Sequence, residues 1–155
     1  MPEPFNPDLL AATWYSGTTP PENWPRLASD ALEAGYDGPA LRRLAGLTAA
    51  TSRDDSEVFK DALKELGNTR IANREHALLF SSRTMAADII DGRVEPLQGA
   101  VVIAGYASML NYPPFLANFY ELVEMQFWGE YAPQTEVLVL DIVEQARTLL
   151  ANVPE

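Results

Sequence analysis

An all-α fold, built as a single-domain bundle of about eight helices, is predicted by three features of the sequence. Apolar residues recur at spacings of three and four through most of the chain. Glycine and proline separate these segments, as they do where one helix ends and the next begins. The one strand-like run, at 137–140, continues into a helical pattern. A length of 155 residues fits one domain over 1–155, with an irregular N-terminus at 1–7.

Four helices are expected in the first half of the chain. The second should place Trp24 in the core, and the third should begin at Pro39, because the first residue of a helix needs no N–H. The fourth has an apolar face opposite a charged one, with Ser52 as its N-cap and Gly67 at its end. The expected ranges are 8–15, 22–34, 39–47 and 52–66.

Four more helices are expected in the second half, at 75–91, 96–110, 114–128 and 135–153. A rotation of about 100° per residue gives the last two helices a broad apolar arc that should face the core. In the helix at 114–128 this arc contains Phe115, Leu116, Phe119, Tyr120, Leu122, Val123 and Phe127. In the last helix it contains Val139, Ile142, Val143, Ala146, Leu149, Leu150 and Val153.

Two of the helix junctions share a pattern. Gly35 precedes Pro39 by four residues, Gly92 precedes Pro96 by four, and an acidic residue stands between them in each case. The glycine is expected to adopt the left-handed conformation that ends a helix, and the proline should open the next one. The two junctions are either ordinary helix corners or parts of a divergent helical repeat.

These junctions also carry a resemblance. The segment Gly-x-Asp-x-Pro-x-Leu-Arg-x-Leu-Ala-Gly at 35–46 and the segment Ile-x-x-Gly-x-x-x-Pro-x-x-Gly at 89–99 resemble segments of small, uncharacterised bacterial all-helical proteins. Both segments are structural corners. The resemblance therefore implies a helical fold and a bacterial source, and it carries over no activity and no site residue.

Composition excludes several classes of function. The 22 Asp and Glu residues against 11 Lys and Arg give a formal net charge of -11, whereas nucleic acids and anionic membranes attract clustered cations. Neither is therefore expected as a partner. The absence of cysteine removes disulfides and thiolate sites, and no glycine-rich phosphate loop is present, so no cofactor is expected. The first residues lack the pattern of a secretory signal, so a cytoplasmic location is expected.

The negative charge is concentrated in one stretch. Residues 94–146 contain no Lys, Arg or His. They contain seven carboxylates, which are Glu95, Glu121, Glu124, Glu130, Glu136, Asp141 and Glu144. A field of one sign attracts partners of the other sign and speeds their association. This stretch therefore predicts a basic protein partner.

The most specific candidate within the stretch is a surface around Trp128. On the expected helix, Trp128 lies between Glu121 and Glu124 on the side away from the core. An aromatic ring surrounded by carboxylates is typical of a protein interface. The alternative is that Trp128 folds beneath the loop that follows it. The candidate partner-binding residues are Glu121, Glu124, Met125, Trp128, Glu130 and Tyr131.

An enzymatic alternative uses two carboxylate pairs. Glu121 with Glu124, and Asp141 with Glu144, are each three residues apart, a spacing that could present oxygen ligands to Mg²⁺ or Mn²⁺. All-α nucleoside-triphosphate pyrophosphatases use a similar arrangement, with Glu-x-x-Glu and Glu-x-x-Asp. Here the second pair is reversed and no base lies nearby to hold phosphates. No metal ligand or catalytic residue is therefore assigned, and His76 is expected to be an exposed residue without a catalytic role.

The sequence thus favours an acidic protein-binding module over an enzyme. Its most concrete form is an immunity or antitoxin-like inhibitor that covers a basic surface of its partner. The alternatives are a metal-dependent nucleotide pyrophosphatase and a structural or oligomerisation module. These patterns leave the oligomeric state open.

Overall fold

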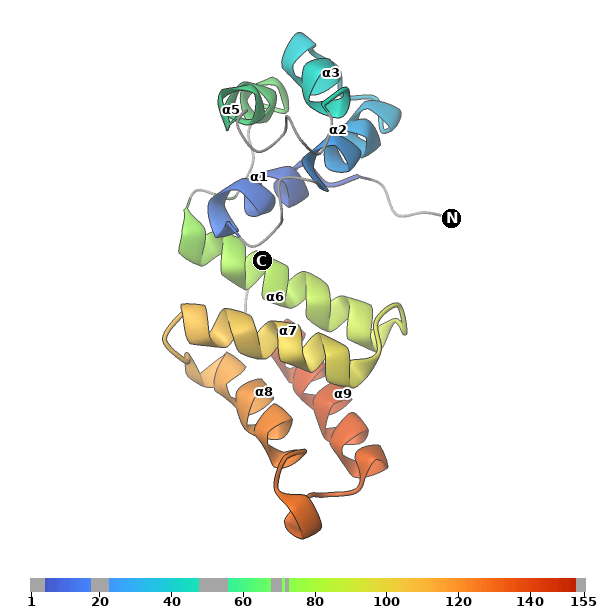
Figure 1. Ribbon diagram of the computed structural model, residues 1–155, viewed down its shortest axis with the longest axis vertical. Helices are drawn as coiled ribbons and strands as arrows, with labels where there is room; N and C mark the ends of the chain where they lie inside the picture. Colours follow the sequence, from blue (N-terminus) through green and yellow to red (C-terminus); the bar gives the residue numbers. More distant parts are fainter. Residues whose placement is uncertain (1–4, 18–22, 48–55, 68–70, 72, 153–155) are drawn as a thin grey trace. The chain divides into compact units, whose positions relative to one another are not determined.

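The all-α class is confirmed by a computed structural model. The structure describes residues 5–17, 23–47, 56–67, 71 and 73–152. Within these ranges it contains eight α-helices, one short 3-10 helix and no strand (Figure 1). In the same ranges no helix combines the length and the apolar character needed to cross a membrane.

The chain divides into two compact units, Met1–Ala77 and Leu78–Glu155, and the boundary falls inside α6 (Arg74–Ile90). The single domain expected over 1–155 stays a prediction. Each unit has its own cluster of buried apolar side chains.

Unit 1 contains α1 (Pro7–Ser16), α2 (Trp24–Glu33), α3 (Pro39–Ala45) and α5 (Ser56–Glu65). Helix α3 packs against both α2 and α5, and α1 contacts the same two helices. Three aromatic rings meet in the core. Phe59 stacks on Trp14 with ring centroids 5.3 Å apart and meets Trp24 edge-on at 4.7 Å. The predicted cap Ser52 lies outside the described residues.

Unit 2 contains most of α6, together with α7 (Pro96–Met109), α8 (Pro114–Met125) and α9 (Thr135–Asn152). The 3-10 helix η2 (Gly129–Tyr131) lies between α8 and α9. Helices α7, α8 and α9 all contact one another. Their largest fully buried side chains are Ile103, Leu116, Phe119, Ile142 and Leu149.

The two glycine–proline junctions adopt the same geometry, as predicted. Gly35 and Gly92 have φ values of 103° and 76° and follow the ends of α2 and α6. Each junction closes with the pair of hydrogen bonds that defines a Schellman motif. In the first, the N–H groups of residues 35 and 36 donate to the carbonyls of residues 32 and 31. In the second, residues 92 and 93 donate to residues 89 and 88.

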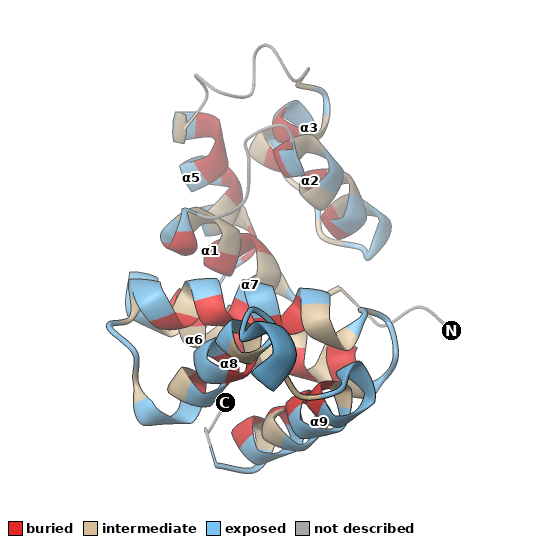
Figure 2. Ribbon diagram, turned by 60° about the horizontal axis from the view of Figure 1, so that its bottom comes forward, coloured by how far each residue is buried: buried red, intermediate tan, exposed pale blue. Residues whose placement is uncertain are grey.

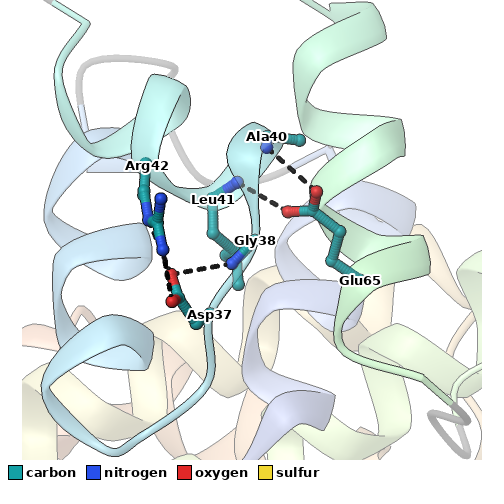
Figure 3. A network of polar contacts seen from close by, with 6 residues as sticks. All are labelled: Asp37, Gly38, Ala40, Leu41, Arg42 and Glu65. Carbon is teal, nitrogen blue, oxygen red and sulfur yellow. Dashed lines mark hydrogen bonds and ion pairs between the residues drawn. The ribbon is translucent and has the colours of Figure 1, made fainter.

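The junctions differ in how the next helix is capped. In α7 the side chain of Glu95 itself accepts from the N–H groups of Leu97 and Gln98. In α3 the corresponding position is Gly38, which has no side chain. The carboxylate of Glu65 arrives from α5 and accepts from Ala40 at 3.0 Å and Leu41 at 2.8 Å (Figure 3). Both helices thus bind a carboxylate at the same two backbone positions, and in unit 1 this bond also ties α3 to α5.

Gly38 is required by this contact and not by backbone strain, since its φ of 168° is extended. A Cβ at position 38 would lie 2.3 Å from the Glu65 carboxylate. Nearby, Arg42 Nε donates to Asp37 at 2.8 Å. This hydrogen bond lowers the pKa of the Asp37 carboxyl below its usual value.

We expect Glu65→Ala to lower the free energy of unfolding by about 1–2 kcal/mol, the usual cost of losing a helix cap. Gly38→Ala should cost about as much, because the new methyl group displaces the same carboxylate. The double variant should then be little worse than either single variant. Urea denaturation of the four proteins measures this coupling. Glu95→Ala removes the cap of α7, so its loss of stability should add fully to that of Gly38→Ala. If the losses from Glu65→Ala and Gly38→Ala also added fully, the two residues would not be coupled and the assigned cap would be wrong.

Several core predictions are wrong in detail. Phe115 and Tyr120 are 37% and 38% exposed, so the apolar arc of α8 is narrower than expected and is centred on Leu116, Phe119 and Leu122. Leu138 is buried in α9 although the predicted stripe omitted it. Val153 lies outside the described residues.

Candidate functional site

The most consequential difference from prediction is at the end of α8. The helix was expected to continue to residue 128, but it ends at Met125. Beyond it the N–H groups of Phe127 and Trp128 donate to carbonyls three residues earlier, at 3.0 and 3.2 Å. Such turns rotate by about 120° per residue rather than about 100°. The side chains of Phe127 and Trp128 therefore leave the faces that an α-helix would give them.

Three aromatic side chains follow this change and are exposed. Phe127 was predicted to face the core, and this prediction is wrong, since it is 73% exposed. Trp128 is 52% exposed, so it is not buried beneath the loop that follows. Tyr131 is 79% exposed. Figure 2 shows the connection between α8 and α9 as mostly exposed.

A tight turn at η2 links two of these aromatic residues. Trp128 is the N-cap of η2, and the N–H of Tyr131 donates to its carbonyl at 3.2 Å. Gly129, at φ 64°, permits the turn between them. We use the name tip surface for Glu124, Phe127, Trp128, Glu130 and Tyr131.

Further apolar exposure continues into the start of α9. Val137 and Leu140 are 46% and 69% exposed, and they lie three residues apart on that helix. Monomeric proteins rarely expose large apolar side chains in contiguous groups, whereas single ones are common. The tip surface with these neighbours is therefore a candidate interface.

Among the described residues, the carboxylates around the tip surface form no ion pair. Between residues 78 and 152 there are nine carboxylates, three arginines and no lysine. Each arginine is engaged elsewhere, since Arg83 donates to the carbonyl of Leu150, Arg93 pairs with Asp88 and Asp91, and Arg147 lies 3.6 Å from Glu144. Within the described residues no ion pair involves Glu121, Glu124, Glu130, Glu136 or Asp141.

The uncompensated charge affects a neighbouring tyrosine. The negative charge of Glu124, one helical turn away, raises the pKa of Tyr120 above its usual value, and Tyr112 adds to the effect. The rings of Tyr112 and Tyr120 meet edge-on at 5.2 Å. Tyr112 and the preceding Asn111 both have positive φ, at 55° and 62°, a conformation that is uncommon outside glycine.

We expect Glu124→Gln to lower the pKa of Tyr120, because removing the negative charge makes the phenolate easier to form. The measurement is an NMR titration of the Tyr120 ring carbons between about pH 8 and 12, since free tyrosine titrates near 10. Glu136→Gln removes a carboxylate that makes no contribution to Tyr120 and serves as the control. A Tyr120 pKa that is the same in wild type and Glu124→Gln would contradict the assigned cause.

The six residues predicted for partner binding are only partly brought together. Trp128, Glu130 and Tyr131 lie in or beside η2, and Glu124 lies on the last turn of α8, four residues before Trp128. Glu121 is exposed one turn further back. Met125 differs from the others, because it is half-buried and packs against the core of unit 2. The sequence reasoning missed Phe127 and Leu140, and only Gly129, as a helix-ending signal, could have pointed to Phe127.

The metal-binding alternative gains no support from the geometry. Residues 73–152 are all described and include Glu121, Glu124, Asp141 and Glu144. Nowhere in the described parts of the chain do three His, Asp or Glu side chains lie close enough to hold one ion. His76 is half-buried rather than exposed.

Comparison of the chain with protein-family models, with curated proteins and with solved structures gives no match. The resemblance of the two corner segments to bacterial helical proteins stays an expectation.

Proposed function

We propose that this chain is a protein-binding module that captures a basic partner through the tip surface. The observation that carries the proposal is the exposure of Phe127, Trp128 and Tyr131 near carboxylates that form no ion pair within the described part of the chain. Aromatic rings gain most from desolvation at the centre of an interface. Unpaired carboxylates accelerate the approach of a basic surface.

In its most specific form the module is an inhibitor of the immunity or antitoxin kind, in the cytoplasm of a bacterium. Surfaces that bind nucleic acid are rich in Lys and Arg, because they neutralise phosphates. An acidic surface with aromatic anchors can occupy such a surface and exclude the nucleic acid. The inhibition would be steric and electrostatic, with no catalytic step.

Photo-crosslinking tests the partner directly. A benzophenone amino acid in place of Tyr131 should capture basic proteins from a bacterial extract. The same group in place of Tyr15, which is 39% exposed in unit 1, controls for nonspecific capture. The captured protein, once purified, should bind nucleic acid less well when this chain is added. Equal capture at both positions, or capture of acidic proteins, contradicts the proposal.

Charge reversal gives a quantitative test. Glu124→Lys with Glu130→Lys should slow association with the captured partner by about 10-fold or more at low salt, and the difference should shrink as salt rises. Asp30→Lys with Glu33→Lys changes the net charge equally on exposed residues of α2. This control should have a much smaller effect in stopped-flow measurements. Equal slowing by both pairs would mean that net charge, and not the tip surface, guides binding.

A further inference from the structure

The tip surface offers two kinds of group in one place, and together they distinguish between the cations of a partner. The rings of Trp128 and Tyr131 present exposed aromatic faces, at 52% and 79% exposure. Glu130 lies between them in η2, and Glu124 lies one turn before Trp128. A cation that approaches this segment therefore has exposed aromatic rings and exposed carboxylates available within residues 124–131.

Arginine and lysine use such a surface differently. A guanidinium is planar and weakly hydrated, so it stacks on a ring and still directs a fork of N–H donors to a carboxylate. An ammonium is a compact, strongly hydrated charge that pairs with a carboxylate and gains less from a flat ring. If the partner were recognised by charge alone, the carboxylates of α8 and α9 would be enough for binding, and the exposed rings would add no affinity.

Lys60 and the three arginines of unit 2 make contacts away from the tip surface. In unit 1, Lys60 lies 5.7 Å from the ring centroid of Trp14. In unit 2 the three arginines bind Leu150, Asp88, Asp91 and Glu144, which are all outside the tip surface. Among the described residues, no cation lies over the ring of Trp128 or Tyr131, so both rings can accept a cation from a partner.

We propose that the tip surface recognises arginine side chains of its partner, with a guanidinium stacked on Trp128 or Tyr131 and paired with Glu130 or Glu124. This inference rests on the proposed capture of a basic protein, and it specifies which basic side chain is read. A lysine-rich surface of equal charge would be captured more weakly.

Two peptides of equal length and charge test the selectivity. One alternates arginine with glycine and the other alternates lysine with glycine. The full chain is labelled with 5-fluorotryptophan, and each peptide is titrated while the fluorine resonances are followed by NMR. The Trp128 resonance is assigned by its loss in Trp128→Leu, which keeps an apolar side chain and removes the aromatic face.

The arginine peptide should bind about fivefold more tightly, the ratio given by a cation–π difference of about 1 kcal/mol. It should also shift the Trp128 resonance more than the lysine peptide does. Trp128→Leu should reduce the preference for the arginine peptide over the lysine peptide. Tyr15→Leu changes an exposed tyrosine of unit 1 and should keep that preference. Affinities for these variants come from calorimetry, and circular dichroism confirms their helical content.

The outcomes separate this inference from the proposed function. Equal affinity for the two peptides overturns arginine recognition and leaves the capture of a basic protein standing. A preference for arginine that survives in Trp128→Leu with Tyr131→Leu overturns the assignment to the tip surface. If neither peptide binds at millimolar concentration and no basic protein is crosslinked at Tyr131, both proposals are wrong.

Discussion

Trp128→Ala should weaken binding of the crosslinked partner by about 30- to 1,000-fold, which corresponds to about 2–4 kcal/mol. The ring is 52% exposed in the free chain, and desolvating it would supply much of the binding energy. Because the side chain is largely outside the core, the free energy of unfolding should change by only a few tenths of a kcal/mol. Calorimetry of the complex and urea denaturation of the free protein measure the two effects.

Tyr131→Ala should also weaken binding, with a smaller effect, since Tyr131 is exposed in the same turn as Trp128. Tyr15→Ala removes a tyrosine of partial exposure from unit 1 and should leave binding unchanged. Binding that is insensitive to Trp128 and Tyr131 together would refute the assignment of the interface to the tip surface.

Phe59→Ala should have the largest effect on stability, lowering the free energy of unfolding by about 3–5 kcal/mol. Phe59 is fully buried, and its ring contacts both Trp14 and Trp24. The truncation leaves a cavity between two large rings that cannot both move into it, and such a loss is a large share of the stability of a small protein. Near-ultraviolet circular dichroism during urea denaturation should show the unfolding of this aromatic cluster at lower denaturant.

Phe127→Ala is a matched control, because the same atoms are removed from a side chain that is 73% exposed. It should change stability by no more than about 0.5 kcal/mol. Similar costs for the two substitutions would contradict the burial that separates them.

Much of the helical framework could be predicted from local sequence. Pro39, Pro96 and Pro114 open their helices as expected, and Gly35 and Gly92 end the helices that precede them. These positions are set by the conformations available to a single residue, so neighbours in space have little influence on them.

The cap of α3 could not be predicted in this way. Gly38 offers no side chain, and the carboxylate that replaces it comes from Glu65, more than twenty residues later. Only the packing of α5 beside α3 brings the two together. Sequence reasoning found the corner but not the residue that stabilises it.

The candidate site was predicted in part. The absence of bases from residues 94–146 pointed to the region that contains the tip surface, because charge is a property of composition. The sequence predicted an exposed Trp128 on the assumption that the helix continues to residue 128. Trp128 is exposed, but the helix ends at Met125. Phe127 was assigned to the core for the same reason, and the early end of α8 at Met125 reverses that assignment.

The sequence by itself determined the all-α class, the glycine–proline corners and the acidic character of the second half. The corners depend on the conformations of single glycine and proline residues, and the helical class and the charge depend on the spacing and composition of residues along the chain. Only the tertiary structure decided that Phe127, Trp128 and Tyr131 leave the core together. Leu122 and Leu138 are the buried core residues of unit 2 on either side of the connection between α8 and α9, and the aromatic side chains of that connection lie outside the core.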